Sequence, residues 1–178
     1  MARRSSGPAP LPAPRLETRL AKERPPPVVV LAGAEDWFRS DALRALVGQV
    51  LPDGDPGGAL TRLDAKPDGA EVHARALEEL GTPSLFVASK VVHVEHAEAL
   101  KRKGARSIRD TLLGVAGQVL SSVTGPGSLL VLDTPKPVKG KTGVPAAALI
   151  EAGAWVIDCR PLYDAPGPWE RGAAAHEH

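Results

Sequence analysis

The chain has 178 residues, enough for one ordinary domain, and 43% of them are hydrophobic, so a core can form without disulfides or metals. The 22 Lys and Arg residues against 21 Asp and Glu give a net charge of +1, which excludes a strongly one-signed molecule. Cys159 is the only cysteine, so an intrachain disulfide is excluded.

Several features predict a cytoplasmic protein. A single cysteine is typical of a reducing compartment, and Cys159 ends an apolar run, which predicts a buried thiol. No stretch approaches the roughly 20 apolar residues of a membrane span, and the amino terminus lacks the apolar centre of a signal peptide. Residues 1–27 are rich in Pro, Arg and Ala, which predicts a disordered tail.

From residue 28 onward, short apolar runs alternate with helical patterns, which is typical of a parallel sheet covered by helices. Asp36 and Asp68 precede apolar residues at spacings of three to four and predict helix starts. The fold class predicted is α/β, with a parallel five-stranded sheet and helices on both faces. The expected strands are residues 28–31, 60–63, 90–94, 129–132 and 155–157, and the expected helices are residues 36–50, 68–80, 108–119 and 145–151.

The turn after the first expected strand, residues 31–36, is where such a fold binds a nucleotide. It carries one glycine, no lysine and two carboxylates, so it opposes a phosphate. Gly140-Lys141-Thr142 matches the end of a phosphate-binding loop, but Pro135 stands where the required glycine should be.

The same region predicts a basic surface loop that contains Lys136, Lys139 and Lys141. One interpretation of this loop is a contact with a phosphate or with a DNA backbone, and the default interpretation is a solvated loop.

Catalytic and metal-binding patterns are weak. Asp133 follows the fourth strand, but Thr134 and Pro135 follow it, which favours a turn-forming role. His93 and Glu95 alternate onto one side of a strand, while His96 is expected to point to the other side. We therefore predict no catalytic residue, no metal and no cofactor.

Ser84, Leu85 and Phe86 follow a helix that ends near Gly81, in a connection where core packing is not guaranteed. A Leu-Phe pair in such a loop can enter an apolar pocket of a partner protein, or it can pack into the domain's own core.

These residues resemble a known family. Residues 84–90, followed by the strand at 91–94, are similar to the clamp-binding element of the bacterial DNA polymerase III delta subunit. Pro168-Trp169 resembles the start of that family's second, lid-like domain. Residues 28–38, 129–136 and 155–162 resemble its first, fourth and fifth strands with their turns.

The resemblance implies an AAA+-like, P-loop-type core with a degenerate nucleotide site at residues 28–164, and a linker and the start of a lid at 165–178. It implies a clamp-loader subunit without intrinsic activity, in a complex with DNA-directed DNA polymerase activity. Leu85 and Phe86 would bind the sliding clamp, the beta subunit, and open the ring for loading onto primed DNA.

The other implied partners are the gamma/tau and delta prime subunits, which family members join through a C-terminal collar domain. The chain ends at His178, near the start of the lid. This position indicates either a truncated chain or a naturally short relative. Two alternatives stay open: a nucleotide-binding α/β enzyme that uses Gly140-Lys141-Thr142, and an unrelated inert α/β adaptor.

Overall fold

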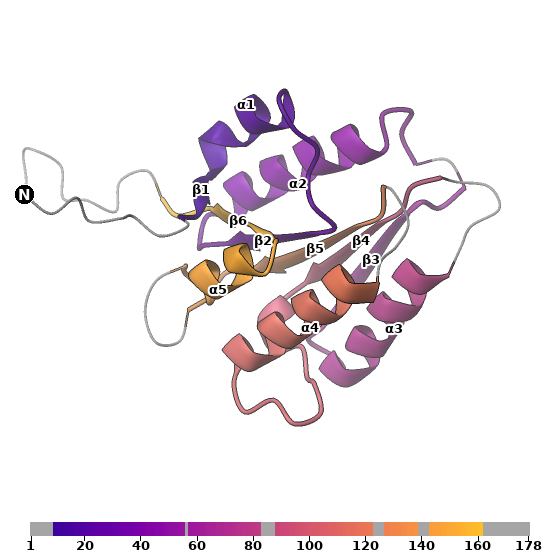
Figure 1. Cartoon of the computed structure of the whole chain (residues 1–178), viewed down its shortest axis with the longest axis vertical. Helices are drawn as coiled ribbons and strands as arrows, with labels where there is room; N and C mark the ends of the chain where they lie inside the picture. Colours follow the sequence, from indigo (N-terminus) through magenta and orange to yellow (C-terminus); the bar gives the residue numbers. More distant parts are fainter. Residues whose placement is uncertain (1–8, 56, 83–87, 123–126, 139–142, 162–178) are drawn as a thin grey trace, which may run out of the picture.

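The fold is a single parallel sheet with helices on both faces (Figure 1). The computed structural model describes residues 9–55, 57–82, 88–122, 127–138 and 143–161. Within them, six parallel strands are ordered β1-β6-β2-β5-β4-β3. The predicted fold class is therefore confirmed, with six strands instead of the expected five.

The elements follow the predicted order from β2 onward. The strands are β1 (Leu11–Pro12), β2 (Val28–Ala32), β3 (Leu60–Asp64), β4 (Val91–Glu95), β5 (Leu129–Thr134) and β6 (Trp155–Asp158). The helices are η1 (Ala13–Arg15), α1 (Leu16–Leu20), α2 (Asp36–Val50), α3 (Gly69–Gly81), η2 (Ala97–Ala99), α4 (Ile108–Ser122) and α5 (Ala146–Glu151).

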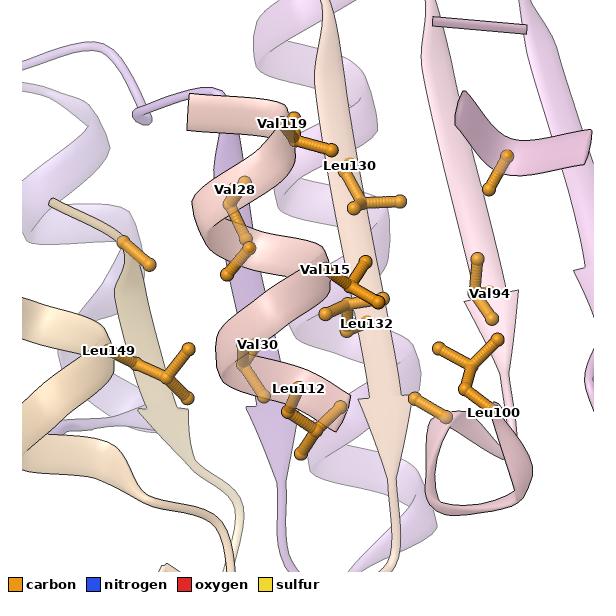
Figure 2. Close-up of a cluster of buried hydrophobic side chains, with 14 of the residues drawn as sticks. Val28, Val30, Val94, Leu100, Leu112, Val115, Val119, Leu130, Leu132 and Leu149 are labelled. Atoms are coloured by element: carbon orange, nitrogen blue, oxygen red, sulfur yellow. The ribbon is translucent and has the colours of Figure 1, made fainter. Parts of the chain in front are cut away.

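The central strand β2 is apolar throughout because the sheet is covered on both faces. All five of its residues are 0% exposed, and it lies between β5 and β6. Val28 and Val30 face α4, whose Leu112, Val115 and Val119 lie over them (Figure 2). Val29 and Leu31 face the opposite layer, which α1 and α2 form. A strand buried on both faces shows a continuous hydrophobic run instead of alternation.

Helix α3 begins where the sequence predicted. The Asp68 side chain accepts hydrogen bonds from the backbone N–H groups of Ala70 and Glu71, both at 3.0 Å. These two groups have no partner within the helix, so the carboxylate caps it. The bonds also hold the pKa of Asp68 below its ordinary value.

The amino-terminal segment differs from the prediction. Residues 9–27 are part of the folded domain: β1 pairs with β6, and α1 packs against α2. Leu16 and Leu20 are buried in the same cluster as Leu46, and the Arg19 guanidinium lies 4.1 Å from the centre of the Trp155 ring. The disordered tail expected for residues 1–27 is therefore wrong for residues 9–27, because buried leucines outweigh the proline-rich composition.

Candidate functional site

The predicted clamp-binding residues Ser84, Leu85 and Phe86 lie outside the described residues, so their assignment stays a prediction. The described residues on both sides of this segment make hydrogen bonds. The Thr82 hydroxyl donates to the Glu78 carbonyl at 2.7 Å, and Lys90 Nζ donates to the Thr82 carbonyl at 2.8 Å. Lys90 directly precedes β4, so the segment joins the sheet at the amino end of that strand.

The turn between β2 and α2 lies at the opposite edge of the sheet and is filled by the domain's own backbone. The N–H of Gly33 donates to the Thr134 carbonyl at 3.2 Å, and the N–H of Glu35 donates to the Cys159 carbonyl at 3.1 Å. Gly33 has a φ of +141°, and a Cβ there would lie 2.4 Å from the Cys159 carbonyl carbon and oxygen. A phosphate bound at this turn would compete with the carbonyls for these N–H groups.

Arg39, in the second turn of α2, ties this turn to the sheet. Its Nε lies 2.7 Å from Asp133 Oδ1, and its two terminal nitrogens donate to the Gly33 carbonyl at 2.5 Å and to the Asp36 carboxylate at 2.9 Å. The Arg39 side chain is 12% exposed. The cation thus occupies the space beside the turn and is compensated by the protein's own carboxylates.

Asp133 also contacts His93. Arg39, His93 and Asp133 together form a largely buried polar group under α2. His93 Nε2 lies 3.2 Å from Asp133 Oδ2, and the His93 side chain is 3% exposed. Asp133 belongs to β5, so the turn-forming role that we expected for it is wrong. The sequence did not predict this group, because its three members come from separate elements.

A cavity of about 520 Å³ opens above this group, between α2 and the sheet. Its walls come from α2, β3, β4 and β5, and it extends from Leu60 at the start of β3 to Pro135 just after β5. Both His93 and His96 line it, so the expectation that His96 points to the other side is wrong. His96 follows the end of β4 with a φ of +53°, and its Nδ1 lies 2.8 Å from Asp64 Oδ1.

Metal binding has no support in the described part of the chain. No group of three or more His, Cys, Asp or Glu side chains there could hold a metal ion. Cys159 is buried, as predicted, and burial raises the pKa of its thiol to about 12, so it is a poor nucleophile. Among the same residues, no helix is both long and apolar enough to cross a membrane.

Basic side chains gather at one place on the surface. Lys101, Arg102, Lys103 and Arg106 are all exposed, in the connection between η2 and α4; we call this the basic segment. Arg109, near the start of α4, donates to the Gly143 carbonyl at 3.4 Å. The start of α4 therefore lies beside the β5–α5 connection, which carries the exposed Lys136.

The other two predicted cations of the β5–α5 connection, Lys139 and Lys141, lie outside the described residues, as do Gly140 and Thr142. Their contact with DNA stays a prediction. The basic segment was not predicted from the sequence, although four cations within six residues indicate a basic surface.

Comparison with known proteins gives matches in structure alone. No protein-family model matches the chain, and no curated protein matches its sequence. The DNA clamp loader delta protein of Bacillus subtilis superposes with a TM-score of 0.58 at 17% sequence identity, over 84% of this chain and 43% of that protein. The chain shares its fold with clamp-loader subunits.

A second solved structure agrees with the first. A DNA polymerase III gamma subunit-related protein of Thermotoga maritima superposes with a TM-score of 0.50 at 12% identity, over 84% of this chain and 46% of that protein. The chain thus spans less than half the length of either structure. The resemblance seen in the sequence is confirmed at the level of the fold.

Proposed function

We propose that the chain is a delta-type clamp-loader subunit, which binds the bacterial sliding clamp through Leu85 and Phe86 and has no ATPase activity of its own. The observation that carries the proposal is the fold shared with a clamp loader delta protein over 84% of the chain. The Leu-Phe motif supports the delta assignment in particular. The proposed place of action is the cytoplasm.

The β2–α2 turn supports the absence of ATPase activity. Two of its N–H groups are already donated to the Thr134 and Cys159 carbonyls. A nucleotide would have to break these bonds and approach Glu35 and Asp36 without a lysine at the turn. In this proposal other loader subunits, of the gamma/tau and delta prime type, supply ATP hydrolysis.

The energy available from the Leu-Phe pair is sufficient for a specific contact. Two apolar side chains that become fully buried contribute about 1.5 to 3 kcal/mol each. To open the ring, the pair must bind the open clamp more tightly than the closed one. The bonds of Thr82 and Lys90 support this role, because they hold the start of β4 and the end of α3 together.

The basic segment supports a further contact, with the phosphates of primed DNA. Lys101, Arg102, Lys103 and Arg106 are exposed, and no ion pair engages them among the described residues. Together with Lys136, and with the predicted contacts of Lys139 and Lys141, they would neutralise several phosphates and give salt-dependent binding.

The test is a titration of the full chain against a purified bacterial sliding clamp by surface plasmon resonance. Replacing both Leu85 and Phe86 with Ala is expected to raise Kd more than 100-fold, because about 3 to 6 kcal/mol of apolar burial is lost. Circular dichroism shows whether the fold is kept. The matched control is Trp37→Ala, since Trp37 is 67% exposed and lies elsewhere, on α2.

Three outcomes would contradict the proposal: no binding by the unaltered chain, equal binding by the double variant, or an equal loss in the Trp37 control. A fluorescent ATP analogue tests the enzyme alternative separately. Tight, magnesium-dependent binding that is lost in Lys141→Ala would favour a nucleotide-binding enzyme that uses Gly140-Lys141-Thr142.

A further inference from the structure

The cavity beside α2 exists because the two layers of helices cover the sheet unequally. On one face, α3 packs on β3 and β4. On the other face, α2 packs on β2 and β5. The side chains of β3 and β4 that point toward the α2 side therefore line an open cavity instead of a helix interface.

The floor of this cavity holds a polar atom without a partner. His93 is 3% exposed, its Nε2 is engaged by Asp133, and its buried Nδ1 has no hydrogen-bond partner. The nearest carboxylate oxygen, Glu95 Oε1, is 3.8 Å away, and the Glu95 side chain is 44% exposed. A buried polar atom without a hydrogen-bond partner destabilises the protein, so binding of a ligand group that bonds to Nδ1 is favoured.

A cation lies beside this histidine on the neighbouring strand. Arg62 of β3 is the register partner of His93, so the two side chains are neighbours on the same face. Arg62 is exposed and makes no ion pair within the described residues, whereas Arg44, also in the cavity wall, pairs with Asp41. Leu43, Val47 and Leu60 add an apolar wall.

We propose that this cavity binds a small organic anion, with its carboxylate or phosphate group between Arg62 and His93 Nδ1 and its apolar part against Leu43, Val47 and Leu60. The anion replaces Glu95 as the neighbour of His93, and the partly exposed Glu95 side chain turns outward. The site is distinct from the proposed clamp and DNA contacts, and its volume of about 520 Å³ suits a small molecule.

Both acidic and basic groups surround His93 in the cavity. His93 faces Asp133 and Glu95 from the sheet, Arg62 from β3, and Arg39 with Asp36 and Arg44 from α2, while His96 is engaged by Asp64. With Nε2–H donated to Asp133, the imidazolium form of His93 presents Nδ1–H to the cavity, and this is the form that an anion binds.

The experiment follows the imidazole nitrogens of His93 by NMR in the full chain during titration with sodium hexanoate, hexyl phosphate and, as a neutral probe, hexanol. We expect a saturable shift of Nδ1 with one or both anions and none with hexanol; comparing the two anions shows which headgroup the site prefers. Arg62→Gln should weaken binding about tenfold, because it removes a charged hydrogen-bond donor.

A second variant separates this site from general attraction of anions. Glu95→Gln should tighten anion binding, because it removes the competing carboxylate, whereas Arg75→Gln and Glu71→Gln on the exposed side of α3 should change nothing. The proposal is overturned if neither anion shifts His93, if hexanol binds as well as hexanoate, or if Arg62→Gln leaves the affinity unchanged.

Discussion

Replacing Leu16 with Ala tests whether the amino-terminal segment is part of the folded domain. Leu16 is 1% exposed and packs in the cluster that contains Leu46 and Trp155. The substitution removes three buried carbon atoms, at about 0.8 kcal/mol each. The cavity left behind raises the expected loss in unfolding free energy to about 3 kcal/mol.

The loss in unfolding free energy for Leu16→Ala has an upper limit, unlike the loss for a substitution in the centre of the domain. Helix α1 has five residues and lies near the chain end, so it can detach and leave the rest of the domain folded. Leu112 of α4 is 0% exposed and cannot detach alone, so Leu112→Ala is the reference. Similar losses for the two variants would mean that α1 unfolds together with the sheet.

Urea denaturation followed by circular dichroism measures both losses, and Trp155 fluorescence reports the docking of α1, since Arg19 lies over that ring. Glu17→Ala, an exposed change in the same helix, is the control. The reasoning is refuted if Leu16→Ala costs no more than Glu17→Ala, within about 0.5 kcal/mol, because such a value is typical of a surface change.

Two further predictions concern titrating groups. With its pKa near 12, the Cys159 thiol should react with Ellman's reagent at pH 8 only as fast as the domain unfolds, and a rate close to that of free cysteine would contradict its burial. Asp68 has a pKa below its ordinary value of 3.8, so its stabilising effect is present above about pH 4 and is lost as the pH falls through the lowered value. Asp68→Ala should therefore lower Tm at pH 7 but hardly at pH 2, and an equal decrease at both pH values would count against the cap.

Most of the fold could be predicted because local chemistry and tertiary structure agree. The run from Val28 to Leu31 forms β2, and Asp68 caps α3 as its spacing indicated. The amino-terminal segment was missed because its prolines dominate the composition. Leu16 and Leu20, four residues apart, were the signal of a packed helical turn.

The candidate site was less predictable because its parts are distant in sequence. Arg39, His93 and Asp133 meet only because the start of α2 lies beside β4 and β5, and no single segment carries the pattern. The left-handed backbone of His96 could not be read from strand alternation. Leu85 and Phe86 stay a prediction from the resemblance.

The strand order also determines when the domain can form during synthesis. Val28 pairs with Leu130, and Leu11 pairs with Ile157. The central strand and the first edge strand therefore cannot pair until residues more than 100 positions later have been synthesised. A nascent chain that ends before β6 thus carries β2 without one of its neighbours. A sheet built from such distant pairings has a high contact order, so its folding is expected to be slow.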